Sequence, residues 1–243
     1  MNNAVMLLEF NDIRKSYGEK VALHVPSWTM QSGEVVGLVG SNGAGKTTFL
    51  RLLLDLLEPD SGQVLFEGRS VVHDQSWRLT TGSFLDRSFL IEYLTIGEYL
   101  EFVGATYGLR KADVARAIEP FTNFLPVSTA DSRRLIRDLS TGNAKKVGIA
   151  AALFVAERLL VLDEPFANLD PPSQIRLKQH LLRLSGQGLS MLISSHDLGH
   201  VTDVCSRITL IGRGEILRDE ARSEETLESL ESYFSSEETG ELT

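Results

Sequence analysis

The stretch "EVVGLVGSNGAGKTTFLRLLLDLL", residues 34–57, decides the fold of this chain. Its apolar start predicts a buried strand, its glycine-rich middle predicts a loop, and the leucine spacing that follows predicts a helix over 46–57. "EPDSG" ends that helix because Pro59 cannot continue it, and "QVLFEG" then resumes as a strand. Strand, loop, helix and strand in this order indicate an α/β fold with a parallel sheet.

The loop inside this stretch, "GSNGAGKTT", matches the pattern G-x-x-x-x-G-K-[ST] between a strand and a helix. Its glycines let backbone N–H groups surround phosphate oxygens, and the helix N-terminus adds partial positive charge. Lys46 would reach the β- and γ-phosphates, and the hydroxyl of Thr47 would bind Mg²⁺. The residues expected to bind the nucleotide here are Gly40, Ser41, Asn42, Gly43, Ala44, Gly45, Lys46, Thr47 and Thr48.

A second apolar strand, "LLVLDEP", stops at two acids and a proline. Open α/β sheets bind ligands at the carboxyl ends of their strands, so Asp163 is a candidate ligand of Mg²⁺. Glu164 is a candidate general base that takes a proton from an attacking water. The alternative is a strand that simply ends in solvated acids.

The rest of the chain alternates in a way that suggests a core with an insertion. Strand-like runs precede the glycine loop, and residues 92–157 are mostly helical in pattern, which indicates a lobe. Beyond "LLVLDEP" the pattern predicts a helix near 172–185, a strand, a helix near 197–205, and two final strands.

Composition and charge exclude several classes of protein. The net charge of the 243 residues is -9, but residues 219–243 hold nine acids against one arginine, so the rest is near neutral. Without a basic stripe, nucleic-acid binding is not expected. The longest apolar run, Val147–Ala156, is far shorter than the roughly 20 residues of a membrane span. No signal peptide is evident and the single Cys205 suits a reducing cytoplasm, where we expect it to be a buried apolar side chain.

Five short motifs occur in one order: "KSYG", the glycine loop, "LSTGN" ahead of "LLVLDEP", "ANLD" and "SSH". In this order the chain resembles the ATP-binding subunit of ABC transporters over nearly its whole length. The resemblance implies that Tyr17 stacks on adenine, that Asp170 belongs to a dimer-contact loop, and that His196 contacts the γ-phosphate. Taken alone, Tyr17 would be an ordinary turn aromatic and His196 a capping or core histidine.

The resemblance also implies a fold and its boundaries. We expect a single ATP-binding domain: a P-loop NTPase core with a mostly parallel sheet, an N-terminal antiparallel β portion and an inserted helical lobe. The core would comprise residues 1–85 and 157–220, the lobe residues 86–156, and an acidic tail residues 221–243.

"LSTGN", residues 139–143, resembles the family's LSGGQ signature, with Ser140 and Gly142 kept. In this family each signature closes over the ATP of a second subunit, which implies an ATP-dependent dimer, expected here to be a homodimer. Ser140 can cap the helix and donate its hydroxyl to a γ-phosphate oxygen. Thr141 and Asn143 replace the usual Gly and Gln, a change expected to weaken the loop without abolishing its role; a plain capping role for Ser140 remains the alternative.

A further departure lies in "TTGSFLDRSFL". Where the family usually has a Gln that joins the ATP site to the helical lobe, this chain places Asp86. Its carboxylate could meet Mg²⁺, and the alternative is an ordinary loop acid.

Together these features predict an ATPase that uses ATP and Mg²⁺ and drives a separate transmembrane permease. Such a subunit would be cytoplasmic and peripheral at the inner face of the cell membrane, with substrate and direction of transport left open. The alternatives are a soluble ABC-family ATPase in protein or iron–sulfur cluster assembly, and a nucleotide-gated binding module without turnover.

Overall fold

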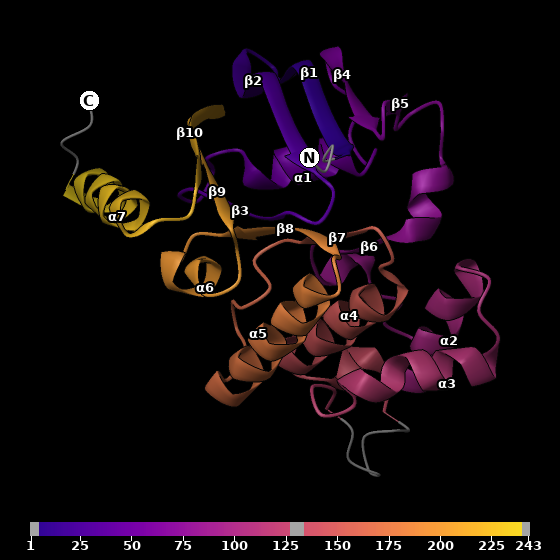
Figure 1. Cartoon of the computed structure of the whole chain (residues 1–243). Coiled ribbons are helices and arrows are strands. Elements are labelled where there is room, and N and C mark those ends of the chain that lie inside the picture. The colour runs from indigo at the N-terminus through magenta and orange to yellow at the C-terminus, as the bar shows by residue number, and fades with distance from the viewer. Residues whose placement is uncertain (1–4, 127–133, 240–243) are drawn as a thin grey trace. The chain divides into compact units, whose positions relative to one another are not determined.

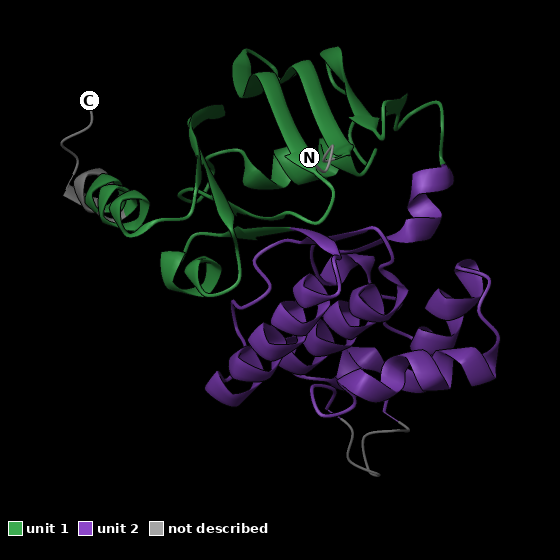
Figure 2. Ribbon diagram, in the orientation of Figure 1, with its two compact units in different colours: residues 1–75, 192–243 green, residues 76–191 purple. Residues whose placement is uncertain are grey.

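The computed structural model describes residues 5–126 and 134–239. The chain forms two compact units, unit 1 from Met1–Gln75 with Leu192–Thr243 and unit 2 from Ser76–Met191 (Figure 2). The expected lobe, residues 86–156, lies inside unit 2, which extends beyond it on both sides. Within the described ranges, no helix has the length and apolar character needed to cross a bilayer.

Unit 1 is built on a sheet whose strands are neighbours in the order β5-β4-β1-β2-β10-β9-β3-β8 (Figure 1). β1 pairs antiparallel with β2 and β4, which confirms the antiparallel N-terminal portion, whereas β3 pairs in parallel with β9. The elements are β1 (Met6–Tyr17), β2 (Lys20–Gln31), β3 (Val35–Val39), α1 (Lys46–Leu53), β4 (Ser61–Phe66), β5 (Arg69–Ser70), β8 (Ser190–Ser195, beginning in unit 2), α6 (Leu198–Thr202), β9 (Arg207–Gly212), β10 (Glu215–Ala221) and α7 (Glu224–Thr239).

An aromatic cluster anchors α1 on the antiparallel strands. The rings of Phe10 and Phe49 stack with centroids 4.1 Å apart, and Trp28 meets both of them edge-on. Aromatic pairs in these geometries add about 0.5–1.5 kcal/mol each beyond the area they bury. Since Phe49 lies in the first turn of α1, the cluster fixes the start of the helix that follows the glycine loop.

The strand that leads into the glycine loop is packed tightly on its neighbours. All residues of β3 are buried, as expected for a strand covered on both faces. A Cβ on Gly37 would lie 1.9 Å from the Val201 side chain and 3.3 Å from the sulfur of Cys205. Cys205 is only 1% exposed, which confirms the expected burial, and desolvation raises the pKa of its thiol to about 12.

The acidic segment that follows β10 forms α7. The side chains of Thr226 and Leu230 are buried, so one face of this charged helix contributes to the core of unit 1. A Cβ on Gly212 would lie 2.8 Å from the hydroxyl of Tyr233, which places α7 against the end of β9. Residues 240–243 of the expected tail lie outside the described residues.

Unit 2 combines a pair of parallel strands with a helical lobe (Figure 1). A Cβ on Gly148 would lie 2.1 Å from the ring of Phe84, so α4 packs closely on β6 because this helix position is a glycine. Residues 127–133 of the expected lobe lie outside the described residues. The elements are η1 (Ser76–Thr80), β6 (Thr81–Phe84), η2 (Arg87–Phe89), α2 (Ile96–Thr106), α3 (Lys111–Ile118), η3 (Glu119–Phe121), η5 (Ile136–Asp138), α4 (Thr141–Val155), β7 (Leu159–Leu162) and α5 (Pro171–Gly186).

One local expectation was wrong, and one strand was not anticipated. The helix predicted over 46–57 ends at Leu53, because Asp55 adopts a left-handed backbone with φ of 52° that cannot continue an α-helix. The sequence pattern assigns no strand to Thr81–Phe84, yet this segment forms β6 and pairs in parallel with β7.

Candidate active site

The loop Gly40–Thr48 joins β3 to α1 with the conformation that a phosphate-binding loop requires. Gly43 and Gly45 have φ of 83° and 116°, values that residues with a Cβ rarely adopt. A Cβ on Gly40 would lie 2.2 Å from the carbonyl oxygen of Ile211, so this glycine permits close approach to β9. Gly45 is the N-cap of α1 and no described side chain caps that helix, which suits an anion at its first turn.

Lys46 is held inside this loop. Its side chain is buried, and its ammonium donates to the carbonyl oxygen of Gly40 at 2.6 Å and to that of Ser41 at 3.2 Å. A buried ammonium is tolerated when hydrogen bonds compensate for lost water, and these bonds place its positive charge beside the loop. The nucleotide-binding residues predicted over 40–48 therefore form one continuous cradle, with Lys46 within it.

The hairpin of β1 and β2, which includes Tyr17, contacts the same loop. A Cβ on Gly45 would lie 3.0 Å from the carbonyl oxygen of Ala22, and the N–H of Gly214 donates to the carbonyl of Ala44 at 2.8 Å. Tyr17 ends β1 and is 53% exposed. An exposed aromatic ring one hairpin turn before Ala22 is available to a planar ligand, and its stacking on adenine stays a prediction.

His196 follows the buried strand β8 directly and is exposed. Two hydrogen bonds stabilise the turn around it. The backbone N–H of Asp197 donates to the hydroxyl of Ser195 at 3.0 Å, and the carboxylate of Asp197 caps α6 by accepting from Gly199. The turn thus presents an imidazole at the end of the strand that neighbours β3 in the sheet.

In unit 2, β7 positions the paired acids. Asp163 is buried, and its backbone N–H donates to the carbonyl of Phe84 at 3.0 Å, which extends the pairing of β6 and β7. Glu164 comes next and has a left-handed backbone with φ of 48°, as does Asn168 with φ of 62°. Residues other than glycine in this region are strained and concentrate at functional sites. Because Asp163 is buried, it is not a solvated acid at the end of a strand.

The signature segment lies against this strained turn. Ser140 is exposed and caps α4, its hydroxyl accepting from the N–H of Asn143 at 3.3 Å. A Cβ on Gly142 would lie 2.7 Å from the carbonyl oxygen of Asn168. Two motifs that are distant in sequence therefore touch within unit 2.

Lys145 contacts the turn that carries Glu164, and the sequence assigned it no role. Its ammonium donates to the carbonyl oxygens of Glu164 and Ala167, the latter at 2.9 Å. Burial lowers the pKa of Lys145, while the nearby carboxylates of Glu164 and Asp163 act in the opposite direction. The only available signal was a basic residue in the first turns of α4, two positions after the signature.

Asp86 and Asp170 both act as local caps. The carboxylate of Asp86 accepts from the N–H of Ser88 at 2.7 Å and caps η2, which is the ordinary role of a loop acid. Asp170 caps α5 and accepts from the hydroxyl of Ser173 at 2.7 Å, a bond that lowers the pKa of its carboxyl. The expected roles of Asp86 at a metal and of Asp170 at a dimer contact stay predictions.

The predicted residues fall into two groups. Unit 1 carries the loop with Lys46 and Thr47, together with Tyr17 and His196; unit 2 carries the remaining predicted site residues, Asp86, Ser140, Gly142, Asp163 and Glu164. Mg²⁺ prefers oxygen ligands, and Thr47 carries a hydroxyl oxygen and Asp163 a carboxylate oxygen, each of the kind that this ion binds. Across the described part of the chain, no group of three or more His, Cys, Asp or Glu side chains forms a self-sufficient metal site.

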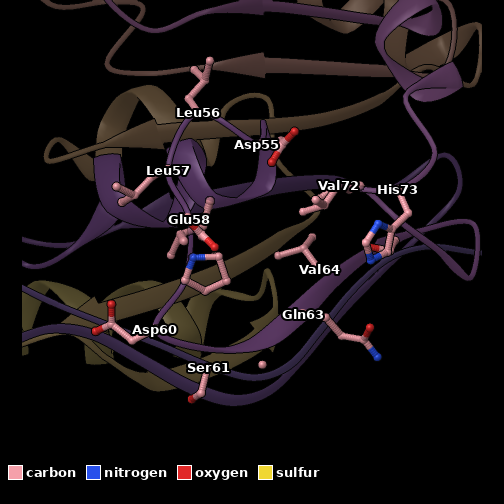
Figure 3. Close-up of a pocket in the computed structure, with 15 residues that line it drawn as sticks. Asp55, Leu56, Leu57, Glu58, Asp60, Ser61, Gln63, Val64, Val72 and His73 are labelled. Carbon is pink, nitrogen blue, oxygen red and sulfur yellow. The ribbon is translucent and has the colours of Figure 1, made fainter.

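Unit 1 also contains a hollow of about 780 Å³ beside the end of α1 (Figure 3). Leucine and valine side chains line it together with carboxylates, and His73 lies at one end while Asp60 lies at the other. None of the predicted site residues lines it. Its lining includes Leu52, Asp55, Leu56, Leu57, Glu58, Asp60, Val64, Val71, Val72 and His73.

Comparison with known proteins places these features in context. The sequence model of the ABC transporter family matches residues 23–167. The lantibiotic transport ATP-binding protein SrtF of Streptococcus pyogenes is 30% identical over 92% of this chain and 95% of its own length. Two other relatives, both 32% identical ABC transporter ATP-binding proteins from Nostoc sp. and Synechocystis sp., are longer, and the chain spans 66% and 54% of their lengths.

Solved structures give the same picture. The ATP-binding subunit of an ABC transporter is 27% identical, with a TM-score of 0.80 over 88% of this chain and 90% of that one. A dimeric bacterial ABC transporter cassette is 25% identical, with a TM-score of 0.79 over 89% of this chain and all of its own.

Proposed function

The chain belongs to the ABC transporter family of ATP-binding proteins, and we propose that it hydrolyses ATP to drive a separate membrane permease. One observation carries the proposal. Lys46 is buried and bonded to the carbonyls of Gly40 and Ser41 inside a glycine loop at the start of α1. An ammonium and a helix N-terminus in one loop suit a nucleotide's phosphates.

The loop would bind the phosphates and Lys46 would offset the charge that develops on the transferred phosphoryl group. Gly43 and Gly45 support this role, since successive N–H groups with positive φ at glycine can turn toward an anion. The hydroxyl of Thr47 and the carboxylate of Asp163 would hold Mg²⁺. When bound, Mg²⁺ supplies positive charge that neutralises the β- and γ-phosphate oxygens.

Glu164 would accept the proton of the attacking water, and His196 would align that water with the γ-phosphate. Both positions suit these tasks. Glu164 follows Asp163 at the end of the buried strand β7, and His196 directly follows the buried strand β8. Tyr17, exposed at the end of β1, would stack on adenine.

Ser140 and Gly142 would complete the site of a second copy of this chain. The exposed hydroxyl of Ser140 can donate to a γ-phosphate oxygen while its oxygen still caps α4. The likeness to a dimeric cassette supports this arrangement. Thr141 and Asn143 keep their backbone N–H groups, so we expect the closure to be weaker than with the usual signature rather than lost.

A permease partner is supported by exposed apolar side chains on unit 2. Phe89, Tyr93 and Phe102 are exposed, Tyr93 to 74%, within a short segment that includes the start of α2. Exposed aromatic side chains such as these are candidates for contact with a partner protein. The transport role named for SrtF favours this function over the soluble assembly ATPase. The subunit would then lie at the inner face of the cell membrane through its permease.

Phosphate release by the purified chain with Mg-ATP tests the proposal. Wild type should hydrolyse ATP, and Glu164→Gln should lower turnover by about 10²–10⁴-fold, the usual contribution of a general base. Binding of ATP should survive, because the glycine loop is untouched. Wild type without turnover would refute the ATPase, and unaltered turnover in Glu164→Gln would refute the role of Glu164.

The mass of Glu164→Gln in solution tests the second copy. If Ser140 closes on the ATP of another chain, Mg-ATP should convert monomer to dimer, since ATP held between two chains favours the closed pair. A protein that binds ATP yet remains monomeric would contradict the homodimer.

A further inference from the structure

Lys145 connects the signature helix to the turn that carries Glu164. It lies in the second turn of α4, and its ammonium donates to the carbonyl oxygens of Glu164 and Ala167. Those carbonyls are 19 and 22 residues away in the chain. One side chain therefore spans two backbone groups of the turn after β7.

That turn needs support from outside itself. Glu164 and Asn168 both have left-handed backbones, and such conformations persist only where the surrounding structure over-determines them. Within the turn, the N–H of Ala167 donates to the carbonyl of Glu164 at 3.2 Å and the N–H of Leu169 donates to that of Phe166 at 3.3 Å. The side-chain amide of Gln174 also donates to the carbonyl of Phe166, but in the described residues the carbonyl of Glu164 receives its side-chain donor from Lys145. Lys145 donates two further hydrogen bonds, to the carbonyl oxygens of Glu164 and Ala167, the two residues that the first of these backbone bonds joins.

The charge of Lys145 suits this use. Bonds from an ammonium are roughly twice as strong as neutral ones, and they strengthen further where water is partly excluded. An apolar side chain of similar length at this position would leave both carbonyls without this donor.

We propose that Lys145 is a positioning residue for hydrolysis, which fixes the backbone of Glu164 so that its carboxylate is held for proton transfer. The proposal rests on the proposed function, in which Glu164 is the general base. Lys145 acts through the peptide group of Glu164 and touches neither ATP nor the attacking water. Misplacing a catalytic group by about 1 Å costs on the order of 10²-fold in rate, so a modest shift of the turn is enough.

The test compares three variants of the full chain. Lys145→Met should lower kcat for ATP hydrolysis by about 10- to 100-fold while KM for ATP stays unchanged, because the glycine loop is intact. Lys145→Arg keeps several donors and should restore most of the rate. Lys111→Met is the matched control, since Lys111 is exposed on α3 and its ammonium pairs with Glu101 at the surface; the turnover of this variant should equal that of wild type.

Two further readouts separate positioning from a general loss of structure. Amide exchange of Phe166–Asn168 should be faster in Lys145→Met than in wild type, with the rest of the chain unchanged. In the Glu164→Gln background, Lys145→Met should have no further effect on kcat, because the two changes act on one step.

Unchanged kcat in Lys145→Met, beside an active wild type, would overturn the proposal. So would equal, additive losses in the wild-type and Glu164→Gln backgrounds, which indicate an effect independent of Glu164. An inactive wild type would instead refute the proposed function, and amide exchange would then still decide whether Lys145 holds the turn.

Discussion

At the scale of single residues, Gly142 shows how little room there is between the signature and the turn after β7. It lies in the first turn of α4, where any side chain points toward the carbonyl of Asn168. The helix itself would accept alanine, which is the better helix former by about 1 kcal/mol. The glycine is therefore explained by contact with the turn and not by helix propensity.

Gly142→Ala should destabilise the protein by about 1–3 kcal/mol, because the added carbon would lie 2.7 Å from a backbone oxygen and the turn must shift. Urea unfolding measures the change. The control is Gly97→Ala in α2, where nothing lies within 4 Å of the added carbon and stability should stay equal or rise. Equal effects in the two variants would contradict the close contact.

The sequence was informative about residues whose roles are local. The loop 40–48 and the cap at Ser140 depend on neighbouring residues, and the structure has both where they were expected. Lys145 could not be found this way, because its partners lie on another element. The left-handed conformation of Glu164 was equally hidden, since glutamate seldom adopts positive φ, whereas Asn168 belongs to a residue type that does so more readily.

At the scale of elements, α2 and α4 both begin with a hydroxyl side chain as the N-cap, and only the cap of α4 is expected to contact nucleotide. Thr95 caps α2 in a full capping box, with Glu98 bonding back to it. Ser140 caps α4 by a single bond to the N–H of Asn143. If Ser140 also contacts a γ-phosphate, comparison with Thr95 distinguishes the effect of losing an N-cap from the effect of losing the phosphate contact.

Ser140→Ala and Thr95→Ala should each cost about 0.5–2 kcal/mol of stability, the usual loss of an N-cap. Only Ser140→Ala should also reduce ATP turnover, because Thr95 has no expected contact with nucleotide. Thermal unfolding and phosphate release on the two variants give both quantities. Equal turnover would show that Ser140 is a cap and nothing more.

Elements with strong patterns were predictable and those defined by a neighbour were not. β3 and β7 are apolar runs bounded by loops, and both were expected. β6 has only four residues and is a strand because β7 lies beside it in register. The end of α1 was missed for a related reason, since "LLDLL" has good helix formers and only the backbone of Asp55 breaks the helix.

At the scale of the whole molecule, the stability of the fold depends on pH through acidic carboxyl groups and through a basic imidazole. Hydrogen bonds from Lys15, Thr95, Arg110 and Ser173 lower the pKa values of the carboxyls of Asp60, Glu98, Asp113 and Asp170 respectively. Any stability that these carboxyls contribute is lost only in acid, as they protonate. His180 differs, because burial and the nearby Arg183 lower the pKa of its imidazole.

His180 should make stability depend on pH in a milder range. Its folded pKa is below the unfolded value of about 6.5, so its contribution is complete above that pH and is lost as pH falls through the folded pKa. His180→Gln should flatten the free energy of unfolding between about pH 7 and pH 5. Urea titrations at several pH values measure it, and an unchanged slope would contradict the assignment. Glu98→Gln is the control and should leave this range unaffected.

The buried thiol beside β3 gives the molecule a reporter of its own opening. Cys205 is the only cysteine in the sequence, and it is 1% exposed beneath the strand that leads into the glycine loop. Because thiolate is the reactive form and burial holds the thiol protonated, reagents can modify it only after local unfolding. The rate of labelling at Cys205 therefore reports how often this part of unit 1 opens. A ligand that stabilises the glycine loop should slow that rate, and the measurement needs no introduced cysteine.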